Sequence, residues 1–192
     1  RGCPIVMYGT SILQGGCVSR PGMANTSLLE RALDMEVINL GFSGNALLDL
    51  DIAQLMASVE TPAVYVLDNA PNCRADRINA HSVEFFRVLR DAHPDVPVVI
   101  VEHPLYPTMR LDIGEREDII ARNNAQKAFY ETLRKSGEKR VYYVSAEKLL
   151  DEMKEGTVDG DHFTDLGVTY YVKAVLPTIK KALKASPNKV GK

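Results

Sequence analysis

The sequence contains no tryptophan, few cysteines and no apolar run near the roughly 20 residues that a bilayer-spanning helix needs. Its three cysteines, Cys3, Cys17 and Cys73, are odd in number and form no Cys-x-x-Cys pair, so neither a disulfide framework nor a zinc knuckle is indicated. A basic excess is also missing, because 23 Lys and Arg face 25 Asp and Glu. Nucleic acid and anionic membrane surfaces are therefore not expected partners.

The length of 192 residues and the 45% hydrophobic content predict a single domain over residues 1–192. The N-terminus lacks the charged, apolar and small-residue regions of a signal peptide. The sequence starts at Arg1 without an initiator Met and soon enters a strand-like run, which predicts a piece of a longer protein. A signal peptide in that longer protein would place it in the periplasm or outside the cell. Residues 186–192 are rich in Pro, Asn, Gly and Lys and are expected to form a frayed tail.

Short apolar runs alternate with stretches of helical periodicity along the whole chain. The strands are continuous apolar runs, as in parallel sheets that are covered on both faces. We therefore expect an α/β fold, a three-layer α/β/α sandwich around a five-stranded, mainly parallel sheet. The predicted strands span 4–8, 36–40, 63–67, 96–101 and 140–144, and the predicted helices span 24–33, 47–59, 79–92, 115–135, 146–153 and 165–185.

Polar residues gather in the loops after the strands, where ligands bind in such sheets. The loop after the first strand, 9–16, is rich in glycine but lacks the lysine of a phosphate-binding loop and the second glycine of a Gly-x-Ser-x-Gly nucleophile elbow. It leaves Ser11 just past a buried strand, exposed at the ligand-binding edge. The alternative is that Ser11 serves only as a helix cap or turn residue.

Two further loops offer hydrogen-bond donors at the same edge. Residues 39–45 hold two glycines in four positions, which allows a close backbone approach with an outward amide, or simply a tight turn. Residues 68–73 hold Asn69 and Asn72, whose side chains could donate to a ligand or form Asx turns.

The segment before the last helix contains Asp159 and His162, three residues apart. At this spacing the carboxylate can accept from one imidazole nitrogen and leave the other to take a proton. A rival interpretation is a metal site of Asp159, Asp161, His162 and Asp165, disfavoured because no neutral nitrogen or sulfur ligands stand nearby in the sequence. Thr164 and Asp165 also suit a helix N-cap.

Taken in order, these segments resemble the SGNH hydrolases, also called GDSL-type esterases and lipases. The resemblance rests on Tyr-Gly-Thr-Ser-Ile at 8–12, Asn-Leu-Gly-Phe-Ser-Gly-Asn at 39–45, Pro-Asn at 71–72 and Asp-Gly-Asp-His-Phe-Thr-Asp-Leu-Gly at 159–167. It implies Ser11 as nucleophile, His162 as base and Asp159 as its partner. It also implies an oxyanion hole formed by the amides of Ser11 and Gly44 and the side chain of Asn72.

The sequence departs from the family pattern at two places, which indicates a divergent subfamily. Thr10 replaces the Asp of the family's name motif, a residue outside the catalytic chemistry. The usual Gly-x-Asn-Asp of the third block is replaced by residues 68–72, which makes Asn72 the expected oxyanion donor and Asn69 the alternative. The subfamily resembled is one in which the catalytic domain follows a separate β-rich module.

The resemblance implies a serine esterase that hydrolyses short acyl or acetyl esters, carbohydrate esters among them, with no cofactor and no metal. The alternatives are a lysophospholipase-like enzyme for longer acyl chains and a binding module without catalysis. His103 follows the fourth strand and is a candidate to line the pocket. Cys17 and Cys73 each follow one of the four segments and are expected to serve packing, as Ser11 already provides the nucleophile.

Overall fold

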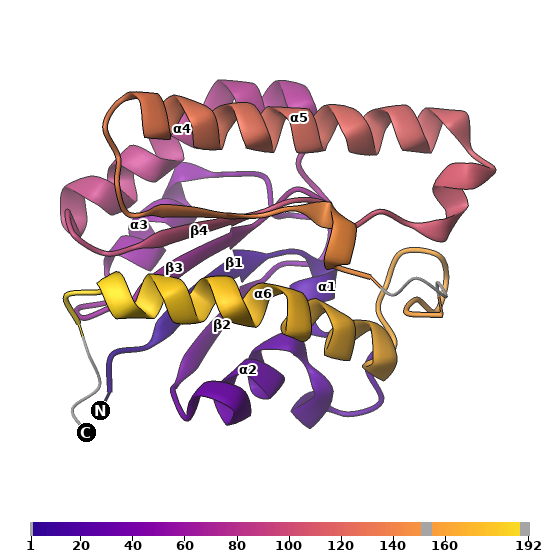
Figure 1. The fold of residues 1–192 in the computed structure, drawn as a ribbon, viewed down its shortest axis with the longest axis horizontal. Coiled ribbons are helices and arrows are strands. Elements are labelled where there is room, and N and C mark those ends of the chain that lie inside the picture. Colours follow the sequence, from indigo (N-terminus) through magenta and orange to yellow (C-terminus); the bar gives the residue numbers. More distant parts are fainter. Residues whose placement is uncertain (1, 151–154, 189–192) are drawn as a thin grey trace.

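The computed structural model describes residues 2–150 and 155–188, and its centre is a five-stranded parallel sheet (Figure 1). The strand order is β2-β1-β3-β4-β5, and every neighbouring pair is parallel. The expected five-stranded α/β sandwich is therefore confirmed. The strands are β1 (Ile5–Gly9), β2 (Val37–Gly41), β3 (Val64–Asp68), β4 (Val98–Val101) and β5 (Val141–Val144).

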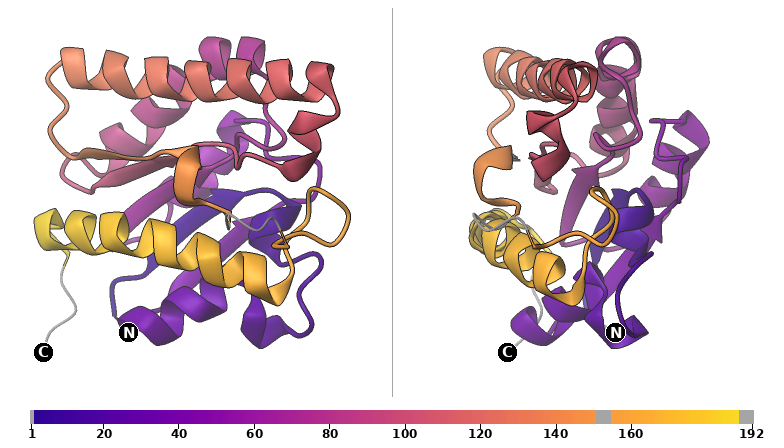
Figure 2. Two further views of the ribbon diagram at one scale, coloured as in Figure 1. Left: turned by 45° about the vertical axis from the view of Figure 1, so that its right-hand side comes forward. Right: turned by 90° about the vertical axis from the view of Figure 1, so that its right-hand side faces the viewer.

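Helices cover both faces of the sheet (Figure 2), so the three central strands β1, β3 and β4 are fully buried, whereas the edge strands β2 and β5 are partly exposed. In β1, Ile5 and Met7 join the core beneath α2 (Asn25–Leu33) and α6 (Asp165–Ala185). Val6 and Tyr8 join the opposite core, which α3 (Leu50–Ala57), α4 (Ala75–Ala92) and α5 (Ile113–Lys135) cover. Because successive strand residues face opposite cores, nearly every strand position is apolar, and the continuous apolar runs in the sequence follow from this.

Several helix boundaries differ from the predictions. The four-residue helix α1 (Ser11–Gln14) was not expected in the glycine-rich loop after β1. Helix α4 starts at Ala75, four residues before the predicted start at residue 79. The prediction was late because the N-cap residue, Arg74, is not a capping residue type that marks a helix start in the sequence. After β5 there is only a short 3₁₀ turn, Ala146–Lys148; residues 151–153 of the helix predicted at 146–153 lie outside the described residues. Two other 3₁₀ turns occur at Pro21–Met23 and Pro107–Arg110.

The described part of the C-terminal tail is packed. Ser186 is only 3% exposed, and the Asn188 side-chain amide donates to the Pro62 carbonyl at 2.8 Å. Ser186 and Asn188 are thus held by hydrogen bonds, whereas Pro187 is exposed. The rest of the predicted frayed tail, residues 189–192, lies outside the described chain. Among the described helices, none combines the length and apolar character needed to cross a membrane.

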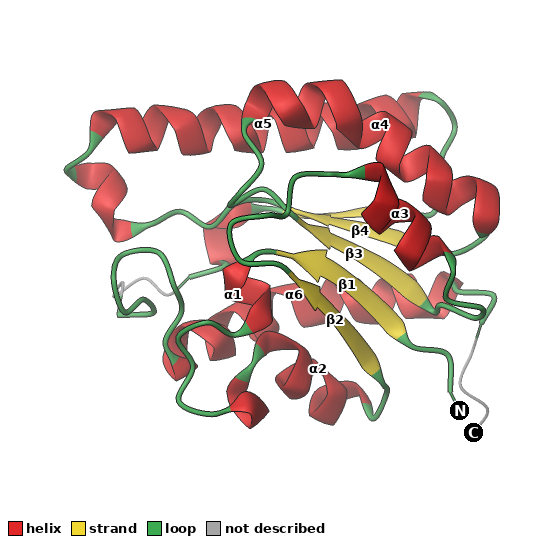
Figure 3. Ribbon diagram, turned by 180° about the vertical axis from the view of Figure 1, so that it is seen from behind, coloured by secondary structure: helices red, strands yellow, loops and turns green. Residues whose placement is uncertain are grey.

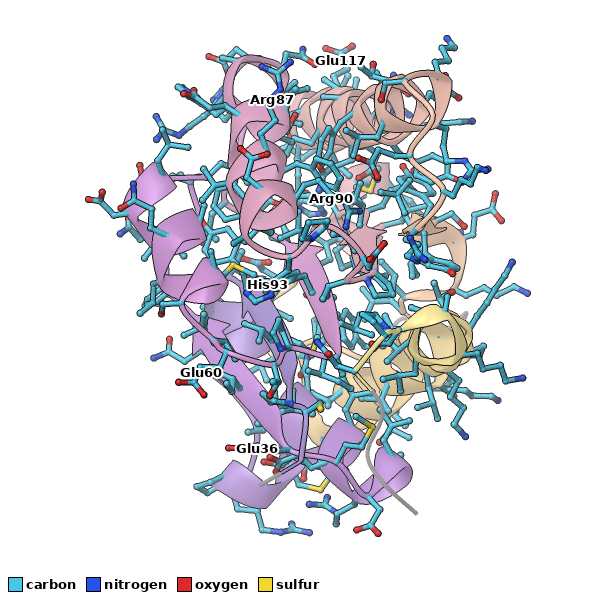
Figure 4. All side chains as sticks on the ribbon, turned by 90° about the vertical axis from the view of Figure 1, so that its left-hand side faces the viewer. Glu36, Glu60, Arg87, Arg90, His93 and Glu117 are labelled. Carbon is cyan, nitrogen blue, oxygen red and sulfur yellow. The ribbon has the colours of Figure 1, made fainter. Side chains whose placement is uncertain are left out.

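The loops singled out in the sequence lie at one end of the parallel strands, the carboxyl end. Figure 3 shows the carboxyl ends of the strands pointing toward α1, and Gly9 is in register with Gly41 on one side and Asp68 on the other. Figure 4 looks onto the amino ends, where the labelled His93 hydrogen-bonds the Ala57 carbonyl at 2.9 Å. The loops singled out in the sequence all meet at the carboxyl edge, as expected for a parallel sheet.

Candidate active site

Ser11 begins α1, directly after the end of β1. Thr10 is the N-cap of this helix, and its hydroxyl accepts from the Ile12 backbone N–H at 3.2 Å. Thr10 therefore fills the capping role that was the alternative for Ser11, and threonine can do so because its side-chain oxygen is an acceptor. Ser11 was expected to be exposed but is only 8% exposed, because the loop 15–17 and His162 lie over it.

Asp159 and His162 lie on a small hairpin that precedes α6. Thr157 and Phe163 form an antiparallel bridge, and the Val158 N–H donates to the His162 carbonyl at 2.8 Å. At the tip, Asp159 Oδ1 accepts from the backbone N–H groups of Asp161 and His162 at 3.0 and 2.8 Å. This Asx-type turn brings the carboxylate to the face of the hairpin that carries the imidazole, which explains the spacing of three residues.

A close glycine contact fastens this hairpin to α6. A Cβ on Gly167 would lie 1.9 Å from the Gly156 carbonyl oxygen, so no larger residue fits there without moving the backbone. The Thr164 N–H donates to the same carbonyl at 2.9 Å, and the Thr164 hydroxyl accepts from the Gly167 N–H as the N-cap of α6. The predicted cap at Thr164 is confirmed, and it fixes His162 relative to the last helix.

Three side chains meet in a continuous hydrogen-bonded row. Ser11 Oγ lies 2.9 Å from His162 Nε2, although 151 residues separate them. His162 Nδ1 lies 2.8 Å from Asp159 Oδ2. Hydrogen bonds from the His162 backbone N–H and imidazole lower the pKa of Asp159 to about 2, so this carboxylate is ionised at neutral pH. The nearest oxygen of Asp161 is 4.0 Å from Nδ1, too far for a hydrogen bond.

The loops after β2 and β3 also reach this edge. Gly44 adopts φ +69°, a conformation that favours glycine, and it is exposed. Asn72 is half-buried, and its Oδ1 faces the Ala46 backbone N–H at 3.5 Å, which leaves its NH₂ group for another acceptor. Asn69 is 1% exposed, and its buried side-chain nitrogen has no hydrogen-bond partner among the described residues. The greater exposure of Asn72 supports Asn72 over Asn69 as a donor to a ligand that enters from solvent.

Two arginines hold these loops, and sequence reasoning missed both. Arg77 of α4 donates to the Leu47 carbonyl and pairs with Asp49 at 2.7 Å. Arg122 of α5 donates to the carbonyls of Ala70 and Pro71, at 3.2 and 2.6 Å. No local motif marks these residues, because their contacts join helices to loops that are distant in the sequence.

A buried pair lies under the site and links β3 to α6. The Tyr171 hydroxyl donates to Asp68 Oδ2 at 2.7 Å, and both residues are shielded from solvent. Burial raises the pKa of Asp68 to about 7, partly offset by the hydrogen bond from Tyr171. This pair helps to set the position of α6, which in turn carries the hairpin of His162.

The remaining candidates from the sequence differ in outcome. His103 is 4% exposed; its Nδ1 lies 2.7 Å from the Pro104 carbonyl, and burial lowers its pKa to about 4. It is thus a neutral core residue in contact with Tyr106.

Cys73 is buried, as its packing role required, but the same prediction was wrong for Cys17, which is exposed. Cys17 lies beside Asp159 and His162 because the loop after α1 folds back toward the hairpin.

The rival metal site is not assembled as proposed. Asp165 lies in the first turn of α6, and its carboxylate accepts from the backbone N–H and hydroxyl of Ser19 at 2.9 and 2.6 Å. It is therefore used to anchor the loop 15–20. The sulfur ligand that the sequence seemed to lack is Cys17, which is 142 residues from Asp159 along the chain.

Comparisons with known proteins identify the family and agree with the fold. The family described as GDSL-like lipase/acylhydrolase matches residues 3–180. A Bacteroides ovatus protein assigned to the GDSL-like lipases superposes with a TM-score of 0.90 and 36% identity. The match covers 97% of this chain and 55% of the Bacteroides ovatus chain. No curated protein sequence matches this chain.

More distant structures share the fold. A salicylyl-acyltransferase from a tetracycline biosynthetic pathway has a TM-score of 0.82 and 19% identity, covering 98% of this chain and 57% of its own. A Clostridium thermocellum family 3 carbohydrate esterase has a TM-score of 0.71 and 18% identity, covering 96% and 98%. The chain thus spans little more than half the length of the Bacteroides ovatus protein and of the acyltransferase. From the family match and the 36% identity, the chain belongs to the GDSL-like lipase/acylhydrolase family.

Proposed function

We propose that this chain is a serine esterase that hydrolyses carboxylic esters through an acyl-serine intermediate, with short acyl or acetyl esters, including those of carbohydrates, as substrates. The observation that carries the proposal is the unbroken row from Ser11 Oγ through His162 to Asp159, with links of 2.9 and 2.8 Å. A serine hydroxyl, an imidazole and a carboxylate in this order are the groups that activate a serine nucleophile.

The reaction begins when Ser11 Oγ attacks the ester carbonyl and His162 Nε2 takes its proton. The ionised Asp159 accepts from Nδ1–H, holds the imidazole in the correct tautomer and stabilises the imidazolium. His162 then gives the proton to the departing alcohol. Water, deprotonated by the same imidazole, attacks the acyl-serine and releases the acid.

The tetrahedral intermediate carries a negative oxygen, which needs hydrogen-bond donors. We assign this role to the backbone amides of Ser11 and Gly44 and the side-chain NH₂ of Asn72. Donors held rigidly at such a position act mainly on the transition state. Rigidity comes from the half-buried Arg77 and Arg122, which tie the two loops to α4 and α5.

Replacing Asn72 and Asn69 in turn tests which of the two side chains donates to the oxyanion. We expect Asn72→Ala to lower kcat about 10²- to 10³-fold with little change in KM, because an oxyanion donor binds the transition state more than the substrate. Asn69→Ala is the matched control and should cost much less activity, because the Asn69 side chain is almost fully buried, at 1% exposure. Steady-state kinetics of the two variants provide the measurement. A larger loss in Asn69→Ala would transfer the donor role to that residue.

A second candidate is hydrolysis of longer acyl esters, which one observation favours. Large apolar side chains are exposed on the stretch 105–113, which borders the hairpin where Gly160 faces Thr108. An acyl chain could lie against such side chains. The exposed residues are Leu105, Leu111 and Ile113 on this stretch and Val158 on the hairpin.

A series of p-nitrophenyl esters distinguishes these candidates. We expect kcat/KM to fall from acetate through butyrate to decanoate if the substrate is a short acyl ester. A rise toward decanoate would instead support the longer-chain enzyme. No turnover of any ester, in protein shown to be folded by circular dichroism, would favour a binding module and contradict both.

A further inference from the structure

A cysteine thiol lies beside the imidazole and carboxylate of the proposed triad. Cys17 Sγ, one oxygen of Asp159 and one ring nitrogen of His162 all lie within 4.8 Å of one another. Cys17 and Asp159 are exposed and His162 is half-buried, so the three residues lie together at the protein surface. The mechanism proposed above uses the other two residues but has no role for this thiol.

The loop that carries Cys17 is fastened on both sides of it. Before it, the N–H groups of Gly15 and Gly16 donate to the Ser11 carbonyl, at 3.1 and 2.9 Å. After it, Ser19 donates twice to the Asp165 carboxylate in the first turn of α6. The fold therefore holds this loop near the hairpin of His162, and the Cys17 side chain on it is exposed.

Thiolate sulfur, imidazole nitrogen and carboxylate oxygen are the ligands that Zn²⁺ takes in proteins. Bond lengths of about 2.0 to 2.3 Å place ligand atoms about 3.3 to 3.6 Å apart in a tetrahedral site. A spacing of up to 4.8 Å therefore needs an adjustment of roughly 1 Å, which a rotation of the exposed Cys17 side chain can provide. Water would complete the fourth position, as in open zinc sites. The nearby Asp161 adds negative charge, with an oxygen 4.0 Å from the imidazole.

We propose that Cys17, Asp159 and His162 form an inhibitory binding site for Zn²⁺ or a similarly thiophilic divalent cation. On binding, the Cys17 thiol loses its proton to solvent and the cation exchanges water ligands for sulfur, nitrogen and oxygen. A cation on Nε2 takes the lone pair that would accept the Ser11 proton. A cation on Nδ1 instead breaks the hydrogen bond between Nδ1 and Asp159. The metal therefore stops the reaction and is not needed for it. The inhibition rests on the proposed function, whereas the binding does not.

The test titrates the metal-free protein with zinc chloride by isothermal calorimetry and follows ester hydrolysis in parallel. We expect one zinc ion per chain, loss of turnover as the site fills and full recovery with EDTA. Cys17→Ser should weaken zinc binding and shift the midpoint of inhibition by the same factor, at least about tenfold, because a hydroxyl is a poor ligand for zinc. Its activity without zinc should match that of the wild type. Cys3→Ser is the matched control and should behave as the wild type.

Absence of stoichiometric zinc binding to the wild-type protein would overturn the proposal, as would equal affinity in Cys17→Ser. Zinc inhibition that persists unchanged in Cys17→Ser would place the inhibitory metal elsewhere and overturn it too. If the protein hydrolyses no ester, the calorimetric comparison still decides the metal site. That outcome would count against the esterase proposal alone.

Discussion

Ser11→Ala should abolish ester turnover, with a loss of kcat of roughly 10⁵- to 10⁶-fold. The reason is that the acyl-serine intermediate cannot form without Oγ, and His162 has no other hydroxyl within hydrogen-bonding distance among its described contacts. The fold should survive, because the Ser11 side chain makes one hydrogen bond and a typical hydrogen bond contributes about 1 kcal/mol to stability. Initial rates with p-nitrophenyl acetate and a thermal unfolding curve measure the two effects.

A fluorophosphonate probe gives a second readout for the same residue. It should label the wild-type protein at Ser11 alone, as found by peptide mass spectrometry, and should leave Ser11→Ala unlabelled. Labelling that persists in the alanine variant, or turnover that survives at near wild-type rate, would remove Ser11 as the nucleophile.

Asp159→Asn should lose most activity, roughly 10³-fold in kcat. Replacing a triad carboxylate by its amide costs up to about 10⁴-fold because the imidazole adopts the wrong tautomer. We expect somewhat less here, since the Asp159 side chain is half exposed and water can replace part of its charge stabilisation. Contacts with His162 hold the pKa of Asp159 at about 2, so this carboxylate stays ionised over the working range.

Asp161→Asn provides the matched control on the same hairpin. Its carboxylate makes no hydrogen bond to the imidazole, so we expect a small effect on kcat. EDTA should leave the activity of the metal-free enzyme unchanged. Activity that chelation removes and zinc or manganese restores would contradict the serine mechanism and make the hairpin part of a catalytic metal centre.

The sheet and the pairing of Asp159 with His162 could be predicted because both depend on local sequence. Continuous apolar runs mark strands that are buried on two faces, and all five runs became strands. An Asx turn closes over three residues, so the spacing of Asp159 and His162 was informative by itself. The family resemblance, confirmed by the match over residues 3–180, added Ser11 from a distant segment.

The support around the site could not be predicted, because it depends on contacts between distant segments. Arg122 reaches the loop of Asn72 from 51 residues away, and its sequence neighbours are those of an ordinary solvated helix. Cys17 was assigned to packing because Ser11 already provided the nucleophile, and nothing in the local sequence indicates that its loop returns to the hairpin. The helix α1 was missed because glycines at 15 and 16 indicated a turn, whereas Gly15 closes the helix with φ +88°.

His162 follows Ser11 by 151 positions, and this separation also orders events during synthesis of the protein. A ribosome adds about 5 to 20 residues per second, so the serine leaves it roughly 8 to 30 seconds before the histidine. In the proposed mechanism, Ser11 has no base during that interval. Its activation would then begin only once the hairpin and α6 have docked on the finished sheet.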